Sequence, residues 1–192
     1  AEETNRDIEN VRSSLADMIG AYASEIVFTS GATESNNMAF KSILFGKIIP
    51  AEKKHIITTQ IEHKCILSIC KFLSTHDYEI TYLKPNSDGI VDSKMLENAI
   101  KPNTALVSVM HVNNELGAIN PLAEIGAVCR DKGILFHSDA AQSFRKLPIN
   151  VDDYDIDIMS MSAHKIGGPK GIGALYIRNL RKLQLEPVIH GA

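Results

Sequence analysis

The sequence contains no tryptophan, and aromatic residues make up only 6% of its 192 positions. It has no apolar run long enough to cross a bilayer, so no membrane association is predicted. It also lacks a basic segment followed by an apolar one at its start, which is the usual form of a secretory leader. The formal net charge of -3 gives no broad positive surface, and we therefore expect no direct binding of nucleic acid.

Cysteine is scarce, and its spacing excludes the common metal sites. The three cysteines, Cys65, Cys70 and Cys129, form no CxxC pair of the kind that holds a metal. Cys65 and Cys70 fall in an apolar stretch with helical character. All three are therefore interpreted as reduced thiols of the core in a reducing compartment.

Apolar residues are distributed in a pattern that alternates between helix and strand. Ile8, Val11, Leu15 and Ile19 recur at helical spacing before Gly20. Further helices are predicted over 34–45, 64–73, 93–100 and 121–133, and strands over 25–29, 55–59, 79–83, 105–110, 134–137, 156–160 and 173–177. This alternation predicts an α/β fold with a mainly parallel sheet sandwiched by helices. Ligands of such sheets gather at the carboxyl ends of the strands.

The first polar strand end is the loop Ser30-Gly31-Ala32-Thr33. A loop of small residues that leads into a helix offers backbone N–H groups and a positive dipole end to a phosphate. The Thr33 hydroxyl would add a hydrogen bond. The alternative is a plain helix cap made by Ser30 or Thr33, and the loop alone favours that alternative.

Two further strand ends carry side chains suited to a flat, oxygen-rich ligand. His63 follows one strand and could stack on a ring, or it could be an ordinary hydrogen-bonded surface histidine. Asn113 and Asn114 follow a buried strand. They could form a turn, because asparagine tolerates unusual backbone angles, or donate hydrogen bonds to a ligand oxygen. The residues alone leave both alternatives open.

Asp139 and Lys165 carry the charges of the candidate site. Asp139 follows a buried strand, where a carboxylate needs a partner such as a helix N-terminus or a cationic ring nitrogen. Most lysines are solvated surface groups. Lys165, however, lies between an apolar strand and a glycine-rich turn, and this setting predicts an amine shielded from water that can form a Schiff base. Together these strand ends supply what pyridoxal 5'-phosphate (PLP) needs: a lysine, a carboxylate and an anion cradle.

The order of these segments and the residues in them resemble the cysteine desulfurases. These enzymes are a branch of the class V aminotransferase superfamily, which has the fold type I of PLP enzymes. The resemblance spans nearly the whole chain. It is carried by the stretches at residues 30–37, 62–64, 111–117, 139–142 and 164–171. It implies that residues 1–192 form the PLP-binding large domain, as a fragment without the N-terminal arm, the C-terminal small domain and the loop with the nucleophilic cysteine.

The resemblance also implies roles for individual residues. Lys165 would form the Schiff base with PLP, and Asp139 would pair with the protonated ring nitrogen. His63 would stack on the ring and move protons, which makes it catalytic together with Lys165. Asn114 and Gln142 would bond the side of the ring that carries the phenolic oxygen.

The remaining implied residues bind the cofactor's phosphate. They are Ala32 and Thr33, helped by Ser162 and His164. The reaction implied by the family removes sulfur from L-cysteine, leaves L-alanine and produces an enzyme persulfide. That sulfur would pass to an iron–sulfur scaffold protein or to another sulfur acceptor, such as a tRNA-thiolation relay, and the enzyme would be a homodimer.

None of the three cysteines matches the family's nucleophile, so we expect this chain alone to be incomplete for sulfur transfer. One alternative is a selenocysteine lyase or another class V PLP enzyme. A second is a cofactor domain without turnover. The absence of a leader indicates the bacterial cytoplasm, although a processed protein of the mitochondrial matrix would have the same sequence features.

Overall fold

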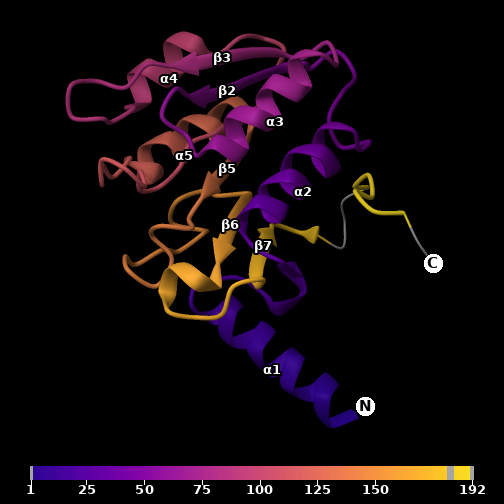
Figure 1. The fold of residues 1–192 in the computed structure, drawn as a ribbon. Helices are drawn as coiled ribbons and strands as arrows, with labels where there is room; N and C mark the ends of the chain where they lie inside the picture. The colour runs from indigo at the N-terminus through magenta and orange to yellow at the C-terminus, as the bar shows by residue number, and fades with distance from the viewer. Residues whose placement is uncertain (1, 181–183, 191–192) are drawn as a thin grey trace.

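The computed structural model describes residues 2–180 and 184–190, and its centre is one seven-stranded sheet (Figure 1). Its strand order is β1-β7-β6-β5-β4-β2-β3. The strands are β1 (Ile26–Thr29), β2 (His55–Thr59), β3 (Glu79–Leu83), β4 (Thr104–Ser108), β5 (Leu135–Asp139), β6 (Ile158–Ser162) and β7 (Gly173–Ile177). The helices are α1 (Glu2–Asp17), α2 (Ala32–Leu44), α3 (Lys64–Ser74), α4 (Ser93–Ala99) and α5 (Leu122–Lys132), with short 3-10 turns η1 (Ala23–Glu25) and η2 (Ala163–Ile166).

The prediction of a mainly parallel sheet is confirmed, with one strand as the exception. The neighbours β3, β2, β4, β5 and β6 all pair in parallel. β7 pairs antiparallel with both β6 and β1. The cause is the connection between β6 and β7, residues 163–172, which is too short for a crossover helix and turns the chain straight back.

Helices cover both faces of the sheet, as predicted. On one face α4, α5 and the end of α1 pack on side chains such as Val107 and Phe136. On the other face α2 and α3 pack on Leu106, Ile158 and Leu175. Successive strand residues point to opposite faces, so central strands need apolar residues at nearly every position. This explains the unbroken apolar runs in the sequence.

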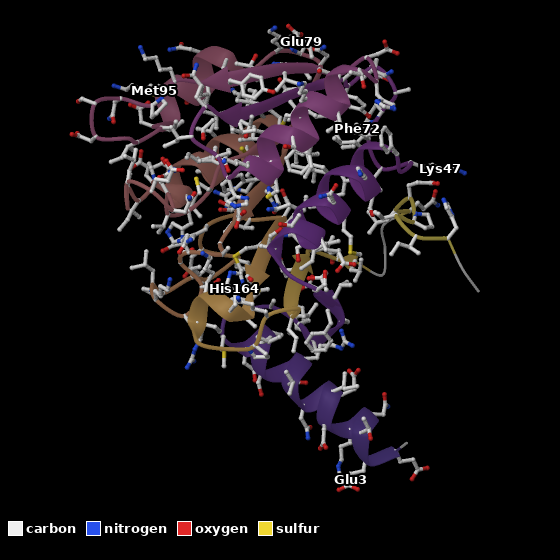
Figure 2. The ribbon with its side chains drawn as sticks, viewed as in Figure 1. Glu3, Lys47, Phe72, Glu79, Met95 and His164 are labelled. Atoms are coloured by element: carbon white, nitrogen blue, oxygen red, sulfur yellow. The ribbon has the colours of Figure 1, made fainter. Side chains whose placement is uncertain are left out.

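The first helix differs from its prediction. Residues 2–17 are helical, but Ile8 is 43% exposed and Val11 is 52% exposed, so the apolar stripe is not buried over this stretch. Figures 1 and 2 show α1 extending away from the sheet, with Glu3 near its far end. Only the C-terminal end of α1 reaches the core, through Ala16. No helix in the described part of the chain is long and apolar enough to span a membrane.

Two buried histidines join neighbouring strands by hydrogen bonds across the sheet. The His55 imidazole lies 2.8 Å from the hydroxyl of Thr81 on β3 and 2.8 Å from that of Thr104 on β4. The His137 imidazole lies 2.8 Å from the Ser108 hydroxyl on β4 and 3.2 Å from the Ser160 hydroxyl on β6. Complete burial lowers the pKa of His137 to about 3, so its ring is neutral and can both donate and accept.

Candidate active site

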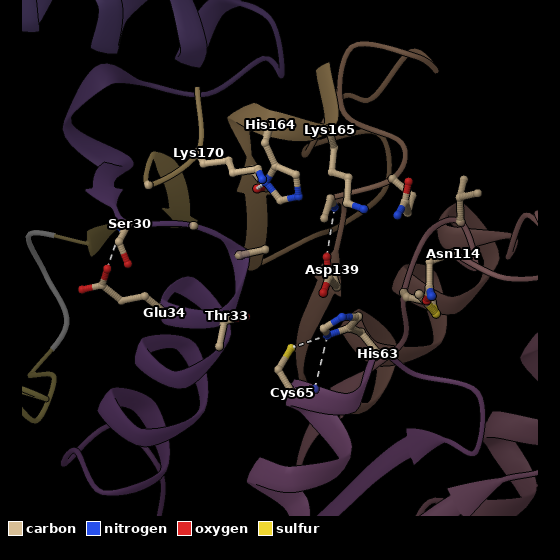
Figure 3. Close-up of a pocket in the computed structure, with 18 residues that line it drawn as sticks. Ser30, Thr33, Glu34, His63, Cys65, Asn114, Asp139, His164, Lys165 and Lys170 are labelled. Carbon is tan, nitrogen blue, oxygen red and sulfur yellow. Dashed lines mark hydrogen bonds between the residues drawn. The ribbon is translucent and has the colours of Figure 1, made fainter. Parts of the chain in front are cut away.

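The loops that follow β1, β2, β4, β5 and β6 surround a cavity of about 450 Å³ (Figure 3). It lies at the carboxyl ends of the strands, where ligands of such sheets bind. All nine residues predicted as a site line this cavity: Ala32, Thr33, His63, Asn114, Asp139, Gln142, Ser162, His164 and Lys165. The structure brings them together although they are spread over more than 130 positions of the chain.

One wall of the cavity is the N-terminus of α2, which begins at Ala32 rather than at residue 34. The N-cap residue is Gly31, with φ 152°, and no side chain caps the helix. The proposed capping by Ser30 or Thr33 is therefore wrong. Glu34 instead accepts a hydrogen bond from the Ser30 backbone N–H. Hydrogen bonding to the side chain and then the backbone of Ser30 lowers the pKa of Glu34. The first-turn N–H groups of Ala32 and Thr33 have no partner within the helix, and both residues line the cavity, as an anion cradle requires.

Asp139 ends β5 and is a buried carboxylate, 5% exposed. Its Oδ1 accepts the Ala141 backbone N–H at 2.9 Å, and its Oδ2 accepts the Asn36 side-chain amide at 2.8 Å. Burial raises its pKa, while these two donors and the nearby His63 oppose the rise. Within the described residues Asp139 forms no salt bridge. A buried carboxylate that has donors but no cation is suited to a cationic ligand.

His63 and Cys65 form a second wall and are joined to each other. His63 is the N-cap of α3, and its Nδ1 accepts the Cys65 backbone N–H at 3.2 Å. The Cys65 Sγ lies 3.0 Å from the same nitrogen. A neutral His63 therefore carries its ring proton on Nε2. His63 is exposed, as the surface interpretation expected, but it also lines the cavity.

The prediction that all three cysteines are core thiols is wrong for Cys65. Cys70 and Cys129 are buried free thiols. Cys65 is half-buried and lines the cavity, because it lies in the first turn of α3 beside the end of β2.

Lys165 lies on η2 and faces the cavity, but it is exposed, so the prediction of a shielded amine is wrong for this chain. The turn and the glycine-rich segment after it form the rim of the cavity, and no described side chain covers them. Figure 3 shows Asp139 between Lys165 and His63 in this view, with Lys170 extending toward His164. The His164 Nδ1 lies 2.8 Å from the Ser162 hydroxyl.

The two adjacent asparagines differ in role: one forms a turn, and the other faces the cavity. Asn113 is buried and structural: its Oδ1 accepts the N–H groups of Glu115 and Leu116, and its Nδ2 donates to the Ile61 carbonyl at 2.7 Å. Asn114 is exposed and lines the cavity. Asn113 thus forms the turn, and Asn114 is available to a ligand.

Two residues beside the site are absent from the sequence-based set. Asn36 is fully buried on α2 and contacts Asp139. The sequence feature that could have identified it is its position as a polar residue on the apolar face of the helix formed by Ala39, Phe40 and Ile43. Glu62 is also buried. Its Oε1 accepts the Thr59 hydroxyl at 3.0 Å and the Met110 backbone N–H at 2.8 Å, while Oε2 has no partner among the described residues. Burial raises the pKa of Glu62 to about 8. No pattern in the sequence predicted that Glu62 would be buried.

The chain is similar to curated cysteine desulfurases. It is 53% identical over 189 residues to the cysteine desulfurase IscS of Rickettsia typhi, covering 98% of this chain and 46% of the relative. It is 50% identical over 189 residues to the mitochondrial cysteine desulfurase of Eremothecium gossypii, covering 98% of this chain and 38% of the relative. The chain thus spans less than half the length of these relatives.

A solved structure described as SspA in complex with cysteine superposes with a TM-score of 0.95 at 51% identity, covering all of this chain and 55% of that one. The structural match includes the mixed sheet with its helices on both faces. The model of the family described as aminotransferase class-V matches residues 1–192. The cysteine desulfurases of this family are PLP-dependent in general. The chain therefore belongs to the class-V aminotransferase family, and its curated relatives named above are cysteine desulfurases.

Proposed function

We propose that the protein carrying this chain is a PLP-dependent cysteine desulfurase that releases L-alanine from L-cysteine. The observation that carries the proposal is Asp139, a buried carboxylate without a cation, in the same cavity as the lysine Lys165 and the uncapped start of α2. PLP combines a cationic ring nitrogen, an aldehyde and a phosphate. Each of these groups has a chemically matching residue in the cavity, so the residues present fit the cofactor.

The phosphate would be held at the rim formed by α2 and η2. Ala32 and Thr33 offer backbone N–H groups and a hydroxyl, and Ser162 and His164 offer a second pair of polar groups that already bond each other. Their donors and the positive end of the helix dipole favour an anion. Asn114 and Gln142 would bond the oxygen substituent of the ring.

The protein's own groups would bind the substrate and move its protons. PLP supplies an electron sink for the substrate's α-carbon. Asp139 would stay ionised and support the charge on the ring nitrogen. Lys165, at the open rim, would hold the cofactor and then act as a base. His63 would exchange protons through Nε2, since its Nδ1 is occupied by Cys65.

The sulfur-accepting cysteine is proposed to lie outside these 192 residues. Cys70 on α3 and Cys129 on α5 are buried in the core, and Cys65 is fixed at the start of α3 against Asn36 and His63. A nucleophile that carries sulfur to another protein needs to leave the site. We further propose a homodimer that delivers sulfur to an iron–sulfur scaffold or another acceptor, in the bacterial cytoplasm or the mitochondrial matrix.

The test uses the protein at its natural length and the variant Lys165→Ala. With PLP, the wild type is expected to form a borohydride-reducible link that mass spectrometry places on Lys165. With L-cysteine it should release alanine. Lys165→Ala should lose the link and nearly all alanine release, by at least about a thousandfold, because the covalent attachment and the base are both removed.

Lys94→Ala is the matched control, since Lys94 is an exposed lysine on α4 that does not line the cavity. It should behave like the wild type. An unchanged reducible link in Lys165→Ala would contradict the assignment of the lysine. A PLP-loaded wild type that releases no alanine from L-cysteine would contradict the proposed reaction.

A further inference from the structure

Asn36 is a buried amide behind the cavity, and it contacts two residues that line it, Asp139 and Cys65. It lies on α2 with no exposed surface. Its Nδ2 donates to Asp139 Oδ2 at 2.8 Å and to the Cys65 Sγ at 3.1 Å. A side-chain amide has two N–H hydrogens, so both donors of Asn36 are used by these contacts.

The environment of Asn36 is unfavourable for an amide that only fills space. The neighbouring inward positions of α2 are Ala39, Phe40 and Ile43, all of them buried. The Asn36 Oδ1 is buried, and no residue in the described part of the chain bonds it. Such an acceptor costs free energy. The contacts of Nδ2 are therefore the interactions that this residue contributes.

The hydrogen bonds have one consistent direction. With Asp139 ionised, the Asn36 amide donates to the carboxylate, and a flipped amide would place Oδ1 against a negative oxygen. The Cys65 sulfur accepts the second amide hydrogen, which leaves its S–H to donate to His63 Nδ1 at 3.0 Å. The chain of bonds thus runs from the carboxylate, through Asn36 and Cys65, to the ring of His63.

We propose that Asn36 is a positioning residue of this site: its amide keeps the Asp139 carboxylate ionised and oriented, and through Cys65 it fixes the His63 ring. The inference rests on the proposed PLP function. It concerns a residue that would not itself touch the cofactor. Asp139 needs such a donor because burial disfavours its charge.

The titratable groups around Asp139 come from three elements. Glu62, in the loop after β2, is a second buried acid, and the charge of Asp139 contributes to the raised pKa of Glu62. Cys65 and His63 face it from the start of α3, and Lys165 faces the same cavity from η2. Of the groups that lower the pKa of Asp139, the Asn36 amide is one of two direct hydrogen-bond donors. Without it, the neutral carboxyl should persist to higher pH.

The experiment compares the PLP affinity of wild type, Asn36→Leu and Asn36→Ser at pH 6 and pH 8. It uses the protein at its natural length, stripped of cofactor and titrated with PLP while its absorbance and intrinsic fluorescence are followed. Asn36→Leu keeps the branched arrangement of the side chain and removes the donors, and we expect about 10- to 100-fold weaker binding at pH 6, the range for a hydrogen bond to a charged group. The loss should be smaller at pH 8, where the carboxyl ionises even without its donor.

Asn36→Ser keeps one O–H donor in a smaller side chain and should fall between the wild type and Asn36→Leu. The matched control is Ser35→Ala. Ser35 is the adjacent residue of α2 and equally buried; its hydroxyl bonds the Ala174 carbonyl and the Thr29 hydroxyl, and neither contact reaches Asp139. Its variant should lose stability without a pH-dependent loss of affinity.

A loss of PLP affinity of the same size at pH 6 and pH 8, or no loss, would overturn the inference. If Asn36 were merely structural, the effect of its replacement would not depend on the ionisation of Asp139. If Asn36→Leu does not fold, the pH dependence of Asn36→Ser decides in the same way. A wild type that binds no PLP at either pH would overturn the proposed function, and this inference with it.

Discussion

At the scale of residues, the two charged groups of the site lie in opposite environments. Asp139 is buried, 5% exposed, and relies on two neutral donors, whereas Lys165 is exposed on the rim. A buried carboxylate interacts strongly with any charge that reaches it, because the surroundings screen little. An exposed amine remains accessible to an incoming aldehyde. The arrangement thus favours a ligand whose positive group lies against the buried Asp139 carboxylate and whose reactive carbon lies near Lys165 at the rim.

Cys65 differs from the other two cysteines in its access to reagents. We expect iodoacetamide to alkylate Cys65 in the folded protein while Cys70 and Cys129 stay unmodified, because both are buried. The reaction should be slow for a thiol, since burial raises the pKa of Cys65 and thiolate is the reactive form. Bound PLP should slow it further, by about tenfold or more, because Cys65 lines the cavity. Peptide mass spectrometry over time gives all three rates.

The control for this labelling is the same reaction in concentrated urea, where all three cysteines should react. Alkylation of Cys129 as fast as Cys65 without urea, or no protection by PLP, would contradict the described position of Cys65.

At the scale of elements, the antiparallel strand β7 fixes the start of α2. A Cβ atom at Gly173 would lie 2.5 Å from the Gly31 Cα and 2.7 Å from the Met161 carbonyl oxygen. The loop before α2 therefore rests directly on the first residue of β7. This close approach requires glycine, and it holds the anion cradle next to η2.

Gly173→Ala is accordingly expected to push the Gly31 loop away from β7. PLP affinity should fall by about tenfold or more, and stability by about 1–3 kcal/mol, the usual range for an overpacked site. Gly126→Ala on α5 is the matched control, because a Cβ there would lie 1.9 Å from the Tyr154 carbonyl oxygen, in a position that does not line the cavity. It should lose stability alone. Titration with PLP and urea unfolding separate the two effects, and equal PLP affinities for both variants would refute the coupling.

Much of this arrangement follows from sequence pattern because strand ends of a parallel sheet meet at one edge. Apolar runs located the strands, and the polar residues that follow them, such as Asp139 and Asn114, converge in one cavity. The direction of β7 did not follow, because a buried apolar strand looks the same in either orientation. The exposure of Lys165 and Ile8 depends on what covers them, and periodicity carries no information about that.

At the scale of the whole molecule, two buried groups set opposite limits on stability. Burial lowers the pKa of His137 from 6.5 to about 3, so unfolding takes up a proton and stability falls as pH drops from about 6.5 to 3. Burial raises the pKa of Glu62 from 4.5 to about 8, so unfolding releases a proton and stability falls as pH rises from about 4.5 to 8. The two trends oppose each other between pH 4.5 and 6.5, where stability should be highest.

Glu62→Gln should remove most of the alkaline fall. Glutamine imitates the protonated acid, so the variant should be more stable than the wild type at pH 9, and the difference should shrink toward pH 5. Each pH unit between the two pKa values of Glu62 corresponds to about 1.4 kcal/mol at most. Urea midpoints at pH 5, 7 and 9 measure this. Glu97→Gln, at an exposed position of α4, should show no such trend, and a pH-independent difference for Glu62→Gln would count against a neutral buried acid.

The hydrogen bonds of His55 and His137 across the sheet also help to fix the relative positions of the residues of the site. Strands that are apolar on both faces could slide past one another and still bury apolar surface, so hydrophobicity alone specifies their alignment weakly. His55 and His137 each bond a hydroxyl on both neighbouring strands, and a slip of one residue would turn these hydroxyls to the other face of the sheet. A slip of one residue would move Asp139 by about 3.3 Å relative to Ser162. The relative positions of the residues that line the cavity thus depend on two imidazoles inside the sheet.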